Sequence, residues 1–126
     1  MNNPAVSAIK RSQKESLIYK IVSHLFVQAA LDDPRLSDIF VNRAQLSPEK
    51  GACYIYFYST LGEDHFKSVF EILKLYKPSM RKALAAEINA RYTPEIIFDY
   101  DRQFYKQCRI ESLLDKIKEK ENLEEE

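Results

Sequence analysis

The sequence predicts an α+β fold of two layers, in which helices cover one side of a three-stranded sheet. Three segments are rich in β-branched and aromatic residues, which is typical of strands. The helical segments each carry apolar residues on one face only. One-sided helices bury their apolar faces by packing on a sheet, and the 126 residues suffice for one domain. No internal repeat is visible.

The first helix is predicted for residues 15–31. Its segment "ESLIYKIVSHLFVQAAL" has one apolar stripe, formed by Ile18, Ile21, Val22, Leu25 and Ala29. Pro34 cannot continue the helix and disfavours helical geometry at Asp33. The next segment, "LSDIFVNRAQL", has the composition of a strand.

A second strand follows a turn that contains Ser47, Pro48 and Gly51. In "ACYIYFYST", Tyr54, Tyr56 and Tyr58 alternate with Cys53, Ile55 and Phe57. The alternation predicts an antiparallel hairpin with the preceding strand. We expect the tyrosines to be half-buried under the helices or at a sheet edge, with base stacking as the alternative.

Two further helices are predicted on either side of Pro78. The segment before it carries an apolar face of Phe66, Val69, Phe70, Leu73 and Tyr76, and the segment after it one of Met80, Ala83, Leu84 and Ile88. Pro78 or Ser79 suits the first turn of the later helix. A third strand, "TPEIIFDY", and a C-terminal helix with Ile110, Leu113, Leu114 and Ile117 on one stripe complete the chain. The predicted order is α-β-β-α-α-β with an added helix.

Charge divides the chain unevenly although the net charge is zero. Residues 1–93 hold 13 Lys+Arg and 9 Asp+Glu, a balance of +4, whereas residues 94–126 hold 6 and 10, a balance of −4. We expect a flexible N-terminus over residues 1–10, a folded domain over 11–115 and a disordered acidic tail over 116–126.

The sequence does not contain the residue patterns that several classes of function require. Two glycines cannot supply a glycine-rich phosphate loop, and Cys53 and Cys108 form neither a zinc motif nor a disulfide framework. Neither His24 nor His65 has a recognisable catalytic partner, and Asp99 with Asp101 marks no acid–base pair. No apolar segment is long enough to span a membrane. We therefore expect a cytoplasmic protein that is not an enzyme and that uses no cofactor, metal or small-molecule substrate.

Cations crowd the region around Pro78. Lys67, Lys74, Lys77 and Arg81 follow one another at spacings of 7, 3 and 4, and Ser79 and Lys82 lie beside them. Such a row beside a helix N-terminus suits phosphates, because free amides and the helix dipole add to the side-chain charges. The alternative is an ordinary solvated face of two amphipathic helices.

Arg35 and Arg43 are further candidates for binding RNA. Arg35 follows the first helix and can instead cap its end, and Arg43 lies in the first predicted strand, on one face or the other.

Three separated stretches resemble the ribosome-binding factor A family. They are "DPRL" at residues 33–36, "QLSPEKGACYIYFYSTLG" at 45–62 and "MRKALAAEINARYTPEIIFDYD" at 80–101, within a similarity that covers about residues 11–114. The resemblance implies a type II KH-like domain with a helix–kink–helix in place of the usual G-x-x-G loop. The family's Ala-x-Gly kink falls at residues 76–78, where this chain has neither residue and Pro78 would interrupt the helix instead.

The resemblance also implies a function. Family members bind the 30S subunit and its 16S rRNA without catalysis and assist late maturation, including processing of the 16S rRNA 5′ end, as monomers. It implies RNA contacts for Lys74, Lys77, Ser79, Arg81 and Lys82.

A second hypothesis is a protein-interaction module of the same fold. It would dock a partner through its sheet edge or its tyrosine-rich strand. The acidic terminus "EKENLEEE" favours this hypothesis because it repels RNA. The salt dependence of binding separates the two hypotheses.

Overall fold

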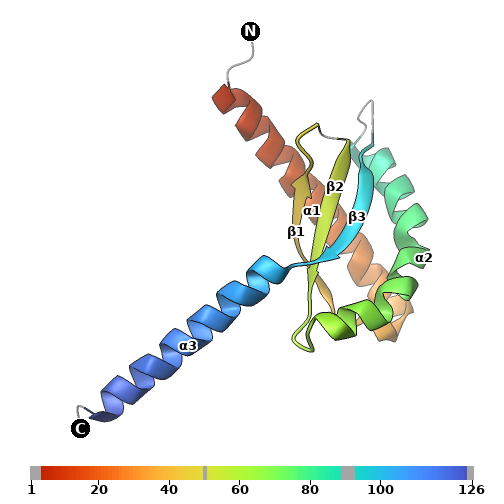
Figure 1. Cartoon of the computed structure of the whole chain (residues 1–126). Coiled ribbons are helices and arrows are strands. Elements are labelled where there is room, and N and C mark those ends of the chain that lie inside the picture. The colour runs from red at the N-terminus through yellow and green to blue at the C-terminus, as the bar shows by residue number, and fades with distance from the viewer. Residues whose placement is uncertain (1–3, 50, 89–92, 125–126) are drawn as a thin grey trace.

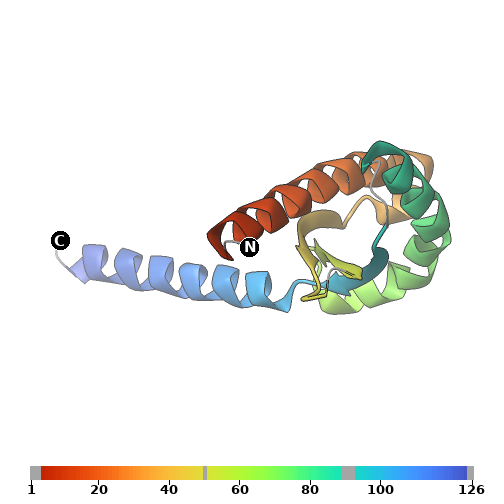
Figure 2. The same cartoon turned by 90° about the horizontal axis from the view of Figure 1, so that it is seen from above.

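The computed structural model describes residues 4–49, 51–88 and 93–124 and confirms the α+β class. Its elements are α1 (Pro4–Asp32), the short 3-10 helix η1 (Pro34–Leu36), β1 (Phe40–Leu46), β2 (Ala52–Tyr58), α2 (Glu63–Ile88), β3 (Glu95–Tyr100) and α3 (Arg102–Glu124). Figures 1 and 2 show α1 and α2 covering one face of the sheet, while α3 projects away from the body.

The sheet has the order β1-β2-β3. β1 and β2 pair antiparallel, which confirms the predicted hairpin. β2 and β3 pair in parallel, with Cys53 opposite Ile96 and Phe57 opposite Tyr100. Parallel neighbours need a crossover, and α2 is that crossover. The helix therefore runs back along β3.

The two faces of β2 differ as the alternating sequence predicts. Cys53, Ile55 and Phe57 are fully buried against the helices. The tyrosines at residues 54, 56 and 58 are half-buried as expected, but they lie on the opposite face and on the central strand. The predicted position under the helices or at a sheet edge is therefore wrong for Tyr54 and Tyr56, because the pleat turns alternate side chains to opposite faces. Tyr58 does lie against a helix, since its ring packs on Phe104 of α3.

α2 is one helix, and the predicted division at Pro78 is wrong. Its buried residues, Phe66, Val69, Leu73, Met80 and Leu84, follow spacings of 3, 4, 7 and 4 across the proline. This stripe keeps one side of the helix against the core throughout, so burial offsets the hydrogen bond that Pro78 cannot donate. Figure 1 shows α2 bent along its length. The end of the predicted third helix, after Ile88, lies outside the described residues.

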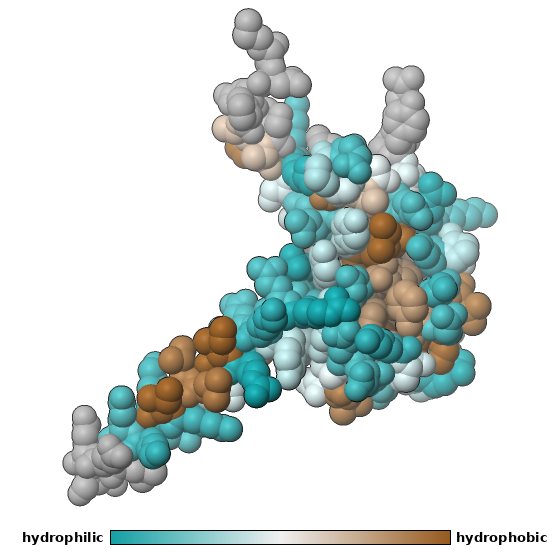
Figure 3. Space-filling view, in the orientation of Figure 1, coloured by the Kyte–Doolittle hydropathy of each residue, from teal (hydrophilic) through white to brown (hydrophobic). Residues whose placement is uncertain are grey.

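Both terminal helices are longer than predicted. α1 begins at Pro4 rather than near residue 15, and a proline is well tolerated in a first helical turn. α3 continues to Glu124, although a disordered tail was expected after residue 115. Figure 3 shows apolar side chains exposed along this projecting helix. The proposed division of the chain into domain and flexible ends stays a prediction.

A buried carboxylate joins three elements at the end of β3. Asp101 is 1% exposed and accepts hydrogen bonds from Arg43 Nε at 2.8 Å, Asn42 Nδ2 at 3.0 Å and the Phe104 amide at 3.0 Å. Successive residues of a strand normally face opposite ways. Asn42 and Arg43 both reach Asp101 because the β1–β2 register shifts between Val41 and Arg43.

These contacts also set the charge state of Asp101. Burial raises the pKa of its carboxyl, but the hydrogen bonds from Arg43, the Phe104 amide and Asn42 lower that pKa by more. The pKa of Asp101 therefore lies below the ordinary aspartate value, and the folded protein favours the ionised form.

We predict that Asp101→Asn lowers the free energy of unfolding by about 2–4 kcal/mol at pH 7, because Arg43 loses its buried partner. A lowered pKa stabilises the fold above the unfolded-state value of about 3.9, and this stabilisation is lost as the pH falls through the folded-state pKa. The difference between variant and parent should therefore shrink below about pH 4. Urea unfolding across a pH series measures it.

Asp99→Asn is the matched control, since Asp99 is 43% exposed and its partners in the described part of the chain are its near neighbours Tyr100 and Arg102. Equal losses of stability for the two variants at pH 7 would contradict the role assigned to Asp101.

Candidate functional site

An open hollow of about 790 Å³ lies between α2 and the chain that enters β3. It is lined by Lys77, Pro78, Arg81, Lys82, Ala85, Thr93 and Glu95. The parallel pairing of β3 with β2 creates this site, because the crossover helix must return beside β3. Three of the predicted RNA-binding residues thus meet at one place.

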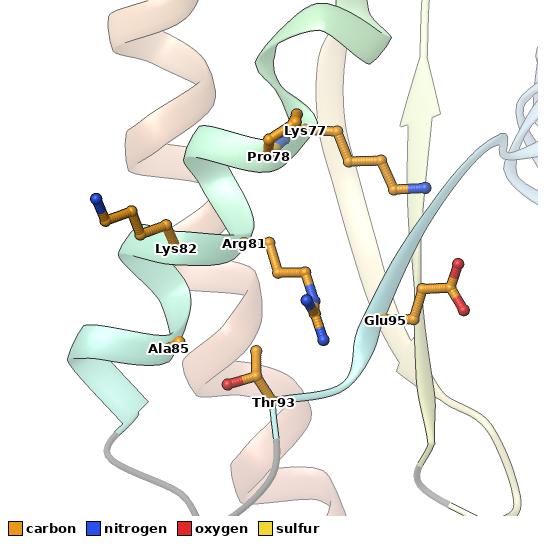
Figure 4. A pocket seen from close by; sticks show the side chains of 7 residues that line it. All are labelled: Lys77, Pro78, Arg81, Lys82, Ala85, Thr93 and Glu95. Atoms are coloured by element: carbon orange, nitrogen blue, oxygen red, sulfur yellow. The ribbon is translucent and has the colours of Figure 1, made fainter.

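Figure 4 shows how the three cations are directed. Arg81 extends into the space between α2 and the segment at Thr93, Lys77 extends toward β3, and Lys82 is turned away from both. The Lys77 ammonium lies 5.8 Å from the centre of the Phe98 ring, a contact that attracts a cation. Arg81 and Lys82 are exposed.

The charges of these three side chains are available to a ligand. Among the residues that the structure describes, no carboxylate lies within 4.0 Å of the charged groups of Lys77, Arg81 or Lys82. Glu95 is the one acid among the lining residues and stands on the β3 side. The hollow is therefore a cationic surface with an acidic border.

Lys67 and Lys74 lie outside the hollow on the same side of α2. Lys67 pairs with Glu63 at 3.5 Å and Lys74 with Glu71 at 3.8 Å, one helical turn away in each case. Both lysines remain more than half exposed, so these pairs are weak and do not exclude another anion. They extend the cationic side of α2 beyond the hollow.

Ser79 does not join this group. It is two residues from Arg81, a rotation of about 200° around the helix, and it does not line the hollow. Since α2 continues through Pro78, no helix begins at Ser79, and the predicted contribution of free amides and a helix dipole there is wrong. Side chains alone supply the positive charge.

Arg35 and Arg43 lie apart from the hollow and have partners. Arg35 makes a two-pronged contact with Asp33, with distances of 2.9 and 2.7 Å, and is 67% exposed. Arg43 pairs with Asp101 at 2.8 Å and lies 4.1 Å from the centre of the Tyr56 ring on the outer sheet face. Their contacts give both residues a structural role, and their binding to RNA stays a prediction.

Thr93 and Glu95 line the site but were not among the predicted residues. No sequence signal marks them, because their place beside α2 follows from strand pairing rather than from a local motif.

The described part of the chain contains no cluster of His, Cys, Asp or Glu that could hold a metal ion. None of the helices in that part is long and apolar enough to cross a membrane.

Comparison with known proteins gives a consistent result. The family model described as Ribosome-binding factor A matches residues 10–114. Similar curated proteins include the Ribosome-binding factor A of Geotalea daltonii, 32% identical over 110 residues, which are 86% of this chain and 88% of that protein. The Ribosome-binding factor A of Prochlorococcus marinus strain MIT 9301 is 36% identical over 112 residues, with 87% and 86% covered.

Solved structures agree with these matches. The solution NMR structure of a Thermotoga maritima protein, proposed to be a ribosome binding factor A, superposes with a TM-score of 0.66. It is 29% identical, and the alignment covers 81% of this chain and 92% of that one. By its match over most of its length, the chain belongs to the ribosome-binding factor A family.

Proposed function

We propose that this chain is a non-catalytic ribosome biogenesis factor that binds the 30S subunit through its 16S rRNA. It acts in the cytoplasm as a monomer and assists late maturation, including processing of the 16S rRNA 5′ end. Family membership supports the ribosomal target. The observation that carries the RNA contact is that Lys77, Arg81 and Lys82 border one hollow without carboxylate partners among the described residues.

Phosphates match the chemistry of this surface. Arg81 can donate two parallel hydrogen bonds to one phosphate, whereas Lys77 and Lys82 act as mobile point charges. Lys67 and Lys74 would meet phosphates further along the strand of RNA. Contacts of this kind position the backbone without reading its sequence, and they release counterions.

The function requires no reaction. A folded domain that binds one conformation of the RNA more tightly than another shifts the population toward it, by as much as the difference in affinity. We infer that the α2 surface acts in this way, by favouring a mature arrangement of the rRNA that it contacts.

The second hypothesis, a protein partner at the sheet edge, meets an obstacle at one end of β1. There the Leu46 amide donates to Glu15 at 2.7 Å, and Arg11 donates to the carbonyls of Leu46 and Ser47. These α1 side chains occupy backbone groups that an added strand would need. The outer sheet face stays available, with Tyr54 and Tyr56 stacked at 6.2 Å.

We predict that the double variant Lys77→Glu/Arg81→Glu binds small subunits about 10- to 100-fold more weakly at about 50 mM salt, because two phosphate contacts become repulsions. Affinity is measured by sedimentation with purified immature subunits. Lys10→Glu/Lys20→Glu is the matched control, since both lysines are exposed on α1 and the charge change is equal. Unchanged affinity in the α2 variant, with its circular dichroism intact, would refute the assignment.

A subtler substitution tests the geometry of the hollow. Arg81→Lys keeps the charge but loses the two-pronged hydrogen bond, and we expect a loss of affinity of about 3- to 10-fold. Lys82→Arg, which keeps a charge outside the space that Arg81 enters, should change affinity by less. If Arg81→Lys binds as well as the parent, charge alone matters at that position.

A further inference from the structure

α3 exposes an apolar stripe that the body of the protein does not cover. Ile110, Leu113, Leu114 and Ile117 are 58%, 51%, 52% and 53% exposed. Their spacing of i, i+3, i+4 and i+7 places them on one side of the helix. Figure 3 shows apolar surface along this arm. A contiguous exposed patch of this kind is typical of a surface that binds another molecule.

Contacts at the base of α3 fix its direction. Phe104 packs on Tyr58 with ring centres 4.7 Å apart, and its amide donates to Asp101. Arg102 pairs with Glu63 of α2 at 2.7 Å. Tyr58 also meets Cys108 in the next turn of α3. The helix is therefore held at its base, and its later turns project away from the core (Figure 1).

Basic and acidic residues lie mostly on different sides of the stripe. Lys106, Arg109, Lys116 and Lys120 follow one side at spacings of 3, 7 and 4, whereas Glu111, Asp115 and Glu119 follow another side at spacings of 4, with Lys118 among them, seven residues from Glu111. A hollow of about 410 Å³ at the basic side is bounded by Tyr58 of β2 and by α3 residues that include Arg109, Leu113 and Lys116. An apolar surface with a cationic margin results.

A second copy of this chain fits that surface poorly. In a parallel pair of α3 helices, Lys106 and Lys120 would face their own copies, because each is seven residues from Leu113. In an antiparallel pair, the basic row of one helix would lie against the basic row of the other. Both arrangements bring like charges together around a stripe only about two turns long.

RNA would suit the basic row of α3 but not its apolar stripe. Phosphates would satisfy the basic row, but they would leave four aliphatic side chains in water. A protein groove satisfies both parts, since helices with anchors at i, i+3, i+4 and i+7 bind in apolar grooves. The basic row then requires carboxylates on one rim of that groove.

We propose that α3 is a docking helix that inserts Ile110, Leu113, Leu114 and Ile117 into an apolar groove of another protein, one rim of which is acidic. The cationic α2 surface plays no part in this contact. The inference rests on the proposed function in one respect, because it places that protein on the small subunit.

The experiment places a photoreactive benzoylphenylalanine at Leu113 of the full chain and, as a matched control, at Glu119 on another side of the helix. Both proteins are irradiated with purified immature small subunits, and sedimentation first shows that they bind. The proposal expects the Leu113 probe to join a subunit protein, at a groove with acids on its rim, and the Glu119 probe to give little product. Products with RNA alone, or no product from bound protein, would overturn it.

A second measurement separates the two proposals. The triple variant Leu113→Ala/Leu114→Ala/Ile117→Ala keeps helix-forming residues and should weaken subunit binding by about tenfold with little change in its salt dependence. Glu111→Ala/Asp115→Ala/Glu119→Ala is the control with equal helix propensity. Equal affinity of the apolar variant and the parent would overturn the docking helix alone. Failure of the parent to sediment would overturn the proposed function, and with it the placement of the partner on the subunit.

Discussion

The parallel pairing of β2 with β3 is the constraint on which the rest of the structure depends. Two parallel strands joined in sequence require a crossover, and here α2 must pass from the end of β2 to the start of β3. Its apolar stripe stays in register across Pro78, so the helix remains continuous and bent rather than broken. The crossover therefore carries Lys77 and Arg81 to the edge of β3.

The chain has no net charge, yet its charges are distributed so that different surfaces suit different ligands. Acids partner Arg35, Arg43, Lys67 and Lys74 to different degrees, whereas the cations around the hollow have no such partner among the described residues. On α3, Glu111, Asp115 and Glu119 lie on another side of the helix from a basic row. The net charge of the sequence shows neither the cations at the hollow that are unpaired among the described residues nor the basic row of α3. Both become visible only when the residues are placed on their helices.

Local patterns predicted most of the fold. The alternation from Cys53 to Tyr58 identified the hairpin, and stripes at helical spacing identified the helices, because both patterns arise from local backbone geometry. Pro78 misled the prediction, since tertiary burial on both sides of a proline is not a local property. The ion pair between Arg43 and Asp101 could not be predicted either. Asp101 is 58 positions away in the sequence, and the pair depends on a register shift between β1 and β2. At the candidate site, the cations were visible in the sequence, but Thr93 and the hollow depend on strand pairing.

Binding of the small subunit by the α2 surface is tested most directly by sedimentation of the purified protein with small subunits, large subunits and whole ribosomes across a salt series. We expect association with small subunits in preference to the other particles. We also expect this association to fall by orders of magnitude between about 50 and 200 mM salt, because phosphate contacts release counterions. Binding to small subunits that does not change with salt would contradict the phosphate-binding role of α2. Absence of binding to every particle, by a folded protein at low salt, would contradict the ribosomal function itself.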